Sequence, residues 1–465
     1  MNAFQGRVTA ALADATLKIA IDRTTNTARA KRAAAIAAWP EFAQARVLGR
    51  DIKDHVIANM EYYLNQFETN AKKTGAKIHW ARTGQEACEI VVGICKAANA
   101  KTVTRSKSML GEEIGLPHAL EAAGIERVET DLAEHIIQLA HEKPSHIIWP
   151  ALHKTREQVG ALFRAHHTDP GALATVEQMV NSARRNLREK FMAADVGISG
   201  ANFLIADTGA ICTVTNEGNA ELTTTPPRVH IVTAGIEKLV PSMVEAMTML
   251  RLLVRSATGA ELTQYTTFHA GPKRAGDVDG PEEFHIVLVD AGRTTMLAEG
   301  LAEMLRCLRC GACMNHCVVY RQIGGHAYGA TYPGPMGSVI TPSLDGLEKS
   351  QDLPRACTLN GQCQEVCPVA IPLPKLIRGW RTKAWVQGYE PVYTAWALRI
   401  WEFLAVRPAL YQVASNMALR MMPLFAKGGW ISKMPMAGGW TRYRDMPRPQ
   451  GATFLAQYKK QQAAK

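Results

Sequence analysis

The chain has 465 residues, of which 47% are hydrophobic and 20% charged, and it carries a formal net charge of +11. This length exceeds what one hydrophobic core normally supports, so two or three domains are expected. No stretch reaches the roughly 18 consecutive apolar residues that a membrane span requires, and the N-terminal residues lack the apolar segment of a signal peptide. Lys and Arg are spread along the chain without a nucleic-acid-binding signature, which argues against nucleic acid and favours an acidic partner or an anionic membrane surface.

Residues 1–70 are expected to form an N-terminal helical region, because an alanine-rich stretch is followed by apolar residues at three-to-four spacing. Residues 71–295 alternate short apolar runs with helical stretches, which predicts an α/β domain with a largely parallel sheet. Helices are expected over residues 84–99 and 117–124. Strands are expected over residues 77–81, 101–108, 127–132, 146–152, 203–214, 228–236 and 284–292.

The pattern then changes to short segments around cysteines, and an α-helical iron–sulfur domain of the ferredoxin type is expected over residues 296–380. Residues 324–342 within it are rich in Gly and Pro and predict an ordered loop. A C-terminal helical tail is expected over residues 381–465. Its amphipathic, tryptophan-containing segments either pack on the chain's own core or dock onto a partner subunit or a membrane surface.

Seven of the ten cysteines lie in two groups whose spacing is typical of iron–sulfur proteins. The first group has the C-x2-C-x2-C-x3-C spacing of bacterial ferredoxins, in which the fourth cysteine ligates the other cluster. The cysteines are Cys307, Cys310, Cys313 and Cys317, followed by Cys357, Cys363 and Cys367. A disulfide framework fits a large chain without a secretory signal badly, and seven thiols exceed one tetrahedral zinc site. Free thiolates that receive clusters indicate a reducing cytoplasm.

The second group lacks one cysteine, because Asn360 stands where a complete motif would place it. If the two groups share ligands, a four-thiolate site that suits a [4Fe–4S] cluster is formed by Cys307, Cys310, Cys313 and Cys367. A three-thiolate site then remains, formed by Cys317, Cys357 and Cys363. Three thiolates suit a [3Fe–4S] cluster or a [4Fe–4S] cluster with one labile iron. The second group resembles that of succinate dehydrogenase and fumarate reductase iron–sulfur subunits, which carry a [4Fe–4S] and a [3Fe–4S] cluster.

Weak candidates for catalysis lie in the α/β region. Glu217 follows an apolar strand in a turn, where it is either an acid, base or nucleophile or a solvated turn residue. Glu129 and Asp131 are either a ligand pair or caps of the following helix. His146 is either catalytic or structural. Lys107, between two serines, could hold a carboxylate or phosphate, but no complete phosphate-loop or dinucleotide fingerprint accompanies it.

Several strings of the α/β region resemble the LUD domain, whose fold is similar to the ribose-5-phosphate isomerase and CoA-transferase families. The strings are residues 106–116, 129–132, 144–147, 200–203, 208–209, 216–219, 235–238, 255–259, 271–272 and 279–281. With the two cysteine groups behind it, the chain resembles the lactate utilization protein B family along almost its whole length. The resemblance implies the iron–sulfur subunit of a three-component system that oxidises L-lactate to pyruvate. Asn360 departs from this pattern, since some members have Cys there.

The expected function is therefore that of an iron–sulfur electron-transfer subunit of an L-lactate-oxidising system, which relays single electrons through two cubane clusters. No flavin or nicotinamide fingerprint is present, so hydride chemistry is expected outside the chain, and whether the chain is an enzyme stays open. Two alternatives remain: a self-sufficient 2-hydroxy-acid oxidoreductase with substrate in the LUD domain, and a redox-sensing regulatory protein. The expected partners are other subunits of the system and an electron acceptor at the membrane surface. The expected location is the cytoplasm, with peripheral contact to the inner face of the membrane.

Overall fold

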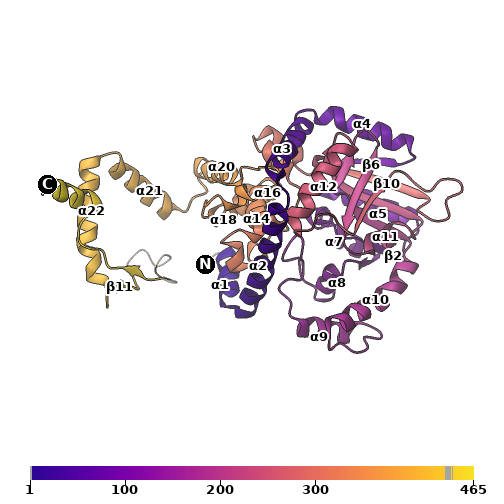
Figure 1. The fold of residues 1–465 in the computed structure, drawn as a ribbon, viewed down its shortest axis with the longest axis horizontal. Helices are drawn as coiled ribbons and strands as arrows, with labels where there is room; N and C mark the ends of the chain where they lie inside the picture. The colour runs from indigo at the N-terminus through magenta and orange to yellow at the C-terminus, as the bar shows by residue number, and fades with distance from the viewer. Residues whose placement is uncertain (1–2, 435–440, 442–443, 465) are drawn as a thin grey trace. The chain divides into compact units, whose positions relative to one another are not determined.

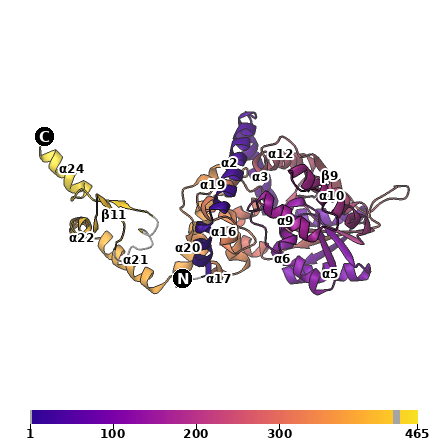
Figure 2. The same ribbon diagram turned by 90° about the horizontal axis from the view of Figure 1, so that it is seen from below.

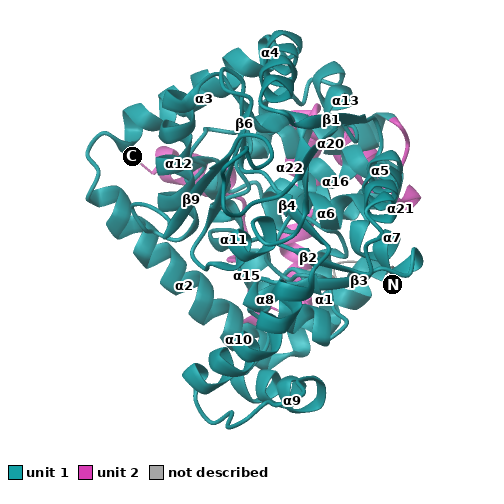
Figure 3. Ribbon diagram, turned by 90° about the vertical axis from the view of Figure 1, so that its right-hand side faces the viewer, with its two compact units in different colours: residues 1–386 teal, residues 387–465 magenta. Residues whose placement is uncertain are grey.

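The computed structural model describes residues 3–434, 441 and 444–464. It divides into two compact units, residues 1–386 and residues 387–465, which Figure 3 distinguishes by colour. The first unit contains the α/β region and both cysteine groups. It opens with four helices: α1 (Ala3–Ala13), α2 (Ala15–Ala37), α3 (Phe42–Ala58) and α4 (Met60–Lys73).

The first unit contains a six-stranded parallel sheet with the strand order β1-β10-β7-β4-β2-β3. Its strands are β1 (Lys77–Ala81), β2 (Thr102–Arg105), β3 (Glu126–Glu129), β4 (Val196–Gly200), β7 (Val229–Gly235) and β10 (Glu283–Val289). Strand β7 is buried along its whole length, and β10 along nearly all of it. Parallel sheets require such cover on both faces, and this confirms the predicted parallel α/β architecture.

Helices cover the sheet and lead into the strands. They are α5 (Gly84–Ala97), α6 (Met109–Ile114), α7 (Leu116–Ala122), α8 (Leu132–Leu139), α9 (Arg156–His166), α10 (Val176–Ala193), α11 (Asn219–Thr224), α12 (Met243–Ala257) and α13 (Arg293–Ala298). Helix α5 shows why the sequence folds this way: Ala87, Val91 and Cys95 recur at helical spacing and are fully buried. They pack against Val103 and Val196 of the sheet in one core cluster. The helices predicted over 84–99 and 117–124 are thereby confirmed.

A smaller second sheet has the strand order β8-β5-β6-β9. It consists of β5 (Phe203–Ile205), β6 (Ala210–Thr215), β8 (Leu239–Val240) and β9 (Tyr265–His269), and the short 3-10 helix η1 (Ile236–Lys238) leads into β8. The prediction of one strand over 203–214 is corrected, because β5 and β6 pair antiparallel across a turn at residues 206–209.

The strand predicted over residues 146–152 is wrong. This segment is irregular in the structure. The ring nitrogen Nδ1 of His146 accepts hydrogen bonds from the backbone N–H groups of Ile148 at 3.0 Å and Trp149 at 3.2 Å. These donors are therefore satisfied locally instead of by a neighbouring strand, and Pro150 has no N–H to donate.

The cysteine segment contains short helices and no strand between residues 302 and 386. The elements are η2 (Ala302–Arg306), α14 (Ala312–Asn315), α15 (Tyr320–Ile323), η3 (His326–Tyr328), α16 (Gly334–Leu344), α17 (Leu347–Ser350), α18 (Asp352–Arg355), α19 (Gln362–Glu365) and α20 (Leu373–Val386). The loop predicted over 324–342 is corrected, because it includes η3 and most of α16. Pro335 lies in the first turn of α16, where its missing N–H breaks no helical hydrogen bond.

The N-terminal helices hold the second cysteine group in place. Figures 1 and 2 both show α2 alongside the cysteine segment. From α2, Arg32 donates a hydrogen bond to the backbone oxygen of Val366 at 2.8 Å. From α3, Arg46 donates to the backbone oxygens of Cys367 at 2.6 Å and Gln364 at 2.9 Å. These bonds join segments more than 300 residues apart in the sequence.

The second unit contains α21 (Val392–Ala405), α22 (Pro408–Met421), η4 (Met422–Phe425), α24 (Phe454–Ala463) and an antiparallel pair formed by β11 (Trp430–Ile431) and β12 (Met446–Pro447). It therefore contains a strand pair besides the predicted helices, and residues 435–440, 442–443 and 465 of the predicted tail lie outside the described residues. Trp396 and Trp401 of α21 are exposed. In the described part of the chain, no helix combines the length and the apolar character that crossing a membrane demands.

Candidate functional site

The fold brings the seven cysteines of the two groups together, and all seven are free thiols. A small cavity is lined by four of them, together with apolar residues that include Ile147, Leu308 and Met336. The four cysteines are Cys307, Cys310, Cys313 and Cys367. They come from both groups, as the shared-ligand pattern of two-cluster ferredoxins predicts.

The other three cysteines also lie close together, because neighbouring thiols within the set raise the pKa of Cys317 and of Cys363. Burial raises the pKa of Cys317, and the neighbouring Cys357 raises it further. Burial together with Cys357 and Cys317 raises the pKa of Cys363 to about 12. Cys313 belongs to the set of four, and Cys363 of the other set is among the neighbours that raise its pKa. The two sets therefore adjoin.

The surroundings of the sulfur atoms suit ligands of a positively charged group. Burial, together with the neighbouring Cys367, raises the pKa of Cys310 to about 12, which means that its thiolate form is disfavoured. Several adjacent thiolates therefore require a compensating cation such as iron. Backbone N–H groups also point at sulfur, which stabilises a ligating thiolate. The N···Sγ distances are 3.4 Å from Arg309 to Cys307, 3.3 Å from Leu359 to Cys357, 3.5 Å from Tyr320 to Cys317 and 3.4 Å from Ile371 to Cys367. The donor set therefore fits iron–sulfur clusters.

The two cysteine groups repeat one backbone conformation. The residue two places after the first cysteine has a positive φ in each group, 59° at Arg309 and 57° at Leu359. A glycine with positive φ follows two places later, Gly311 at 72° and Gly361 at 87°, and each precedes a one-turn helix. The two groups are thus superposable in register, and position 360 corresponds to position 310.

Asn360 takes the place that Cys310 occupies in the first group. Its side-chain oxygen accepts a hydrogen bond from the backbone N–H of Gln362 at 3.2 Å. The corresponding backbone N–H in the first group, that of Ala312, hydrogen-bonds to Cys310. The environments differ in one respect, because Cys310 is only 8% exposed whereas Asn360 is exposed to solvent.

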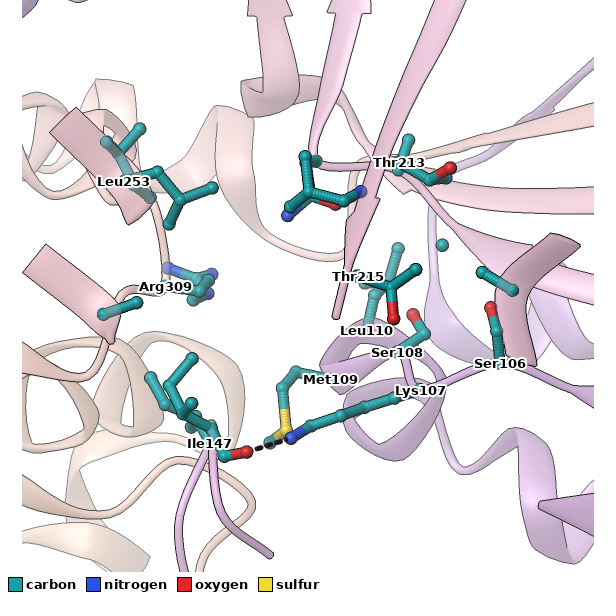
Figure 4. Close-up of a pocket in the computed structure, with 18 of the residues that line it drawn as sticks. Ser106, Lys107, Ser108, Met109, Leu110, Ile147, Thr213, Thr215, Leu253 and Arg309 are labelled. Carbon is teal, nitrogen blue, oxygen red and sulfur yellow. Dashed lines mark hydrogen bonds between the residues drawn. The ribbon is translucent and has the colours of Figure 1, made fainter. Parts of the chain in front are cut away.

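A second, larger cavity of about 360 Å³ lies where β2, β4 and β7 end. Parallel α/β sheets place ligand sites at this edge, beyond the carboxyl ends of their strands. In Figure 4, Arg309 projects into the cavity, and Lys107 extends across it to donate a hydrogen bond to the backbone oxygen of Ile148 at 2.7 Å. Ser106, Ser108 and Thr215 add hydroxyl groups to the lining.

Arg309 belongs to a network of charged groups on one wall of this cavity. Its guanidinium stacks over the ring of Tyr332 at 4.8 Å and lies 3.5 Å from Glu237. The buried Arg293 donates to Glu237 at 2.5 Å and to Glu113 at 2.8 Å. Burial alone would raise the pKa of Glu237, but the surrounding cations, Arg293 foremost, lower it to about 2.

Lys238 lines the same cavity beside this network. Burial lowers its pKa to about 8, and Arg309 lowers it too, while Glu237 and Cys307 act in the opposite direction. None of the described residues forms a hydrogen bond with its ammonium group or an ion pair within 4 Å. Lys238 is therefore the cation of this wall without a direct partner.

Of the four residues predicted as weak catalytic candidates, Glu217 and Asp131 line the cavity. Asp131 caps α8, because its carboxylate accepts hydrogen bonds from the backbone N–H groups of Ala133 at 3.0 Å and Glu134 at 3.2 Å. Partial burial of Glu217 raises its pKa, and the negative charge of Asp131 adds to this effect. These two carboxylates are the pair that the structure brings together.

Glu129 and His146, the other two candidates, do not line the cavity and make buried structural contacts. Glu129 is buried and ion-paired with Arg105 at 2.7 Å and Arg127 at 2.8 Å, and it neither caps α8 nor lines the cavity. His146 is buried, and its Nε2 lies 3.1 Å from the side-chain oxygen of Asn315 in the first cysteine group. Burial lowers the pKa of His146 to about 3, so this ring is neutral and links the two regions.

Sequence reasoning missed the charged wall formed by Glu237, Lys238, Arg293 and Arg309. A partial signal existed, since Glu237 and Lys238 belong to one of the strings that resemble the LUD domain, and Arg309 lies inside the first cysteine group. The spacing of the cysteines could not reveal that these residues meet, because they come from η1, α13 and the loop before α14.

Three family models match the chain: the LUD domain over residues 64–289, a 4Fe-4S dicluster domain over residues 303–371, and the lactate utilisation protein B C-terminal family over residues 388–463. The α/β region is therefore a LUD domain with a parallel sheet, and it precedes an iron–sulfur dicluster domain. The predicted similarity of its fold to ribose-5-phosphate isomerase and CoA-transferases stays a prediction, as does the ferredoxin type of the helical domain.

Two relatives match almost the whole chain. The uncharacterized electron transport protein YkgF of Escherichia coli K12 is 42% identical over 429 residues, which cover 91% of this chain and 89% of that protein. Lactate utilization protein B of Bacillus thuringiensis is 42% identical over 440 residues, which cover 93% of this chain and 91% of that protein. Among solved structures, a DUF162 family protein from Deinococcus radiodurans matches with a TM-score of 0.28 and 15% identity, covering 50% of this chain and 98% of that chain. The chain belongs to the lactate utilization protein B family.

Proposed function

We propose that this chain is the iron–sulfur electron-transfer subunit of an L-lactate-oxidising system and relays electrons through two clusters. Membership of the family and the dicluster domain support an iron–sulfur component of lactate utilization. The observation that carries the relay is the arrangement of seven buried or partly buried thiols in two adjoining sets. We assign the set of four, Cys307, Cys310, Cys313 and Cys367, to a [4Fe–4S] cluster. We assign Cys317, Cys357 and Cys363 to a [3Fe–4S] cluster or a [4Fe–4S] cluster with a labile iron.

A bound cluster supplies reversible one-electron storage at each set. The chain's own residues make this storage possible in three ways. Ile147, Leu308 and Met336 give the set of four an apolar wall that excludes water. Backbone N–H groups, such as that of Arg309, donate to sulfur and thereby tune the potential. Hydrogen bonds from Arg46 fix the backbone at Cys367, so that the two groups keep their relative positions.

The partners that follow from this role are the other subunits of the system, which carry out the hydride chemistry, and an electron acceptor at a membrane surface. The composition of the second unit supports such an acceptor, because residues 387–465 contain eleven Lys and Arg but only three Asp and Glu. This excess of positive charge attracts an anionic surface. Exposed Trp396 and Trp401 are residues that settle at membrane–water interfaces.

The test is to record EPR spectra and an iron count on anaerobically purified protein, and then to add L-lactate together with an extract from cells that lack this chain. We expect a sharp, nearly isotropic signal in the oxidised state, a [4Fe–4S] signal after dithionite, and the same reduction by L-lactate only when the extract is present. Reduction by L-lactate without extract would instead favour a self-sufficient enzyme. Clusters that L-lactate never reduces, while the extract still oxidises L-lactate, would contradict the relay and favour a sensor.

A further inference from the structure

We propose that the large cavity of the LUD domain binds a small organic carboxylate, whose charge pairs with Lys238 and Arg309 next to the Cys307–Cys310 loop. This inference rests on the proposed function, because it takes the neighbouring set of four thiols to hold a cluster. It goes beyond that function by giving the LUD domain a ligand of stated chemistry and a position for it.

The charges on the cavity wall favour an anionic ligand. On the cavity wall, Arg293 is matched by Glu237 and Glu113, and Arg309 lies 3.5 Å from Glu237. Lys238 is left without a direct partner among the described residues, although it is partly buried. A partly buried ammonium without a partner is unfavourable unless water or an anion compensates it. A carboxylate ligand supplies that charge, and the adjacent guanidinium of Arg309 provides further N–H donors in a planar arrangement that suits a carboxylate.

The rest of the cavity lining suits a small organic acid. The cavity volume of about 360 Å³ is in the range of small-molecule sites. Hydroxyl groups from Ser106 and Ser108 offer hydrogen bonds to a polar substituent, and Met109 and Leu253 offer apolar contact, as Figure 4 shows. An organic acid with a hydroxyl or keto group combines the features that this lining recognises.

This cavity shares a wall with the set of four thiols. Ile147, Leu308 and Arg309 line both the large cavity and the small one bordered by Cys307, Cys310, Cys313 and Cys367. Lys238 lines the large cavity together with Leu308 and Arg309, and both of these also border the small cavity at Cys307. A negative charge bound at Lys238 therefore disfavours the reduced state of the neighbouring cluster, whose potential becomes more negative.

The experiment uses the anaerobically purified, cluster-loaded full chain. Calorimetric titration with pyruvate, L-lactate and inorganic phosphate measures binding, and an EPR-monitored redox titration measures the potential of the [4Fe–4S] signal with and without pyruvate. The variants are Lys238→Met, Lys238→Arg and, as a matched control, Lys96→Met, since Lys96 is exposed on α5 and does not line the cavity. Iron content and EPR intensity show whether each variant is loaded.

We expect pyruvate or L-lactate to bind and to shift the potential of the first cluster to a more negative value. Lys238→Met should weaken this binding by more than about tenfold, which corresponds to loss of one charged hydrogen bond. Lys238→Arg should restore most of the binding, and Lys96→Met should leave it unchanged. If Lys238→Met fails to fold, Ala257→Phe decides the matter, because Ala257 lines the cavity and a phenyl group there should block the ligand.

A loaded wild-type protein that binds neither carboxylate would overturn the inference and leave the relay intact. Binding that survives both Lys238→Met and Ala257→Phe would place the ligand elsewhere and also overturn it. Phosphate binding of equal affinity would show a general anion site and contradict the assignment to a carboxylate. Failure of the wild-type protein to take up iron at all would instead contradict the proposed function.

Discussion

Replacing Asn360 by Cys is the sharpest test of how the two cysteine groups share ligands. Position 360 corresponds to position 310 in the repeated backbone, with Leu359 at φ 57° and Arg309 at φ 59° before them. A cysteine at 360 therefore needs no backbone change. The Gln362 N–H, which now donates to the Asn360 oxygen at 3.2 Å, remains available to the new sulfur.

The expected change is one iron atom per chain. If the three thiolates of the second site hold a three-iron cluster and a fourth thiolate completes it, the iron content rises from about seven to about eight atoms per chain. The present corner is also open to water, since Asn360 is exposed whereas Cys310 is buried. Solvent access at the corner without a thiolate favours loss of that iron, which is why the three-iron form is expected in the natural chain.

The assay is EPR of the oxidised protein together with an iron and sulfide determination. In Asn360→Cys the nearly isotropic oxidised signal should disappear, and a second reduced [4Fe–4S] signal should replace it. Asn360→Ala is the matched control, because it also removes the amide but adds no ligand, and it should keep the oxidised signal. An unchanged spectrum in Asn360→Cys would refute the ligand assignment, and conversion of a four-iron cluster to a three-iron one in Asn360→Ala would show that the amide itself holds the fourth iron.

Three further predictions concern single residues. Cys310→Ser should remove the reduced [4Fe–4S] signal while the oxidised signal persists, and loss of both would mean that the two sets do not assemble independently. Arg293→Met should cost about 3 kcal/mol, because it removes the nearest cation of the buried Glu237 carboxylate and leaves it only the 3.5 Å contact with Arg309. Since the pKa of Glu237 is lowered from 4.5 to about 2, its ion pairs stabilise the natural chain above about pH 4.5 and are lost as the pH falls towards 2. Thermal unfolding should therefore show a larger deficit in Arg293→Met at about pH 5 than at about pH 3, and an equal deficit at the two pH values would contradict this reasoning. Asp131→Ala should cost about 1 kcal/mol through loss of the α8 cap and should leave both EPR signals unchanged.

The fold was predictable where local pattern and tertiary environment agree. Helix α5 follows from apolar residues at helical spacing, and β10 from a continuous apolar run. Strand β4 was missed because its sequence contains two glycines, which weaken a strand signal. The structure gives the reason for one of them: a Cβ atom at Gly197 would lie 1.7 Å from the backbone oxygen of Thr223. The strand expected at 146–152 failed because a side chain, His146, satisfies backbone donors that no periodicity analysis takes into account.

The thiol site and the cavity also differ in how far the sequence predicts them. The thiol ligands are close in sequence within each group, and their spacing together with the shared-ligand pattern of two-cluster ferredoxins predicts which of them belong to one site. The cavity wall is assembled from η1, α13 and the loop at Arg309, and its charge balance depends on which Glu meets which Arg. Pairing of this kind is a property of the folded chain, and the partner that is missing at Lys238 could not be recognised before the pairs were known.

The shared wall between cavity and thiols gives the proposed relay a direction. The cavity adjoins the set that contains Cys307 and Cys310, whereas the exposed Asn360 marks the outer edge of the other set. Cys313 and Cys363 lie where the two sets adjoin. If electrons enter the proposed relay beside the LUD cavity, they pass from the set of four to the set of three and leave near Asn360. This order requires the cluster beside Asn360 to have the higher potential of the two, and cluster type is one of the properties that set this potential.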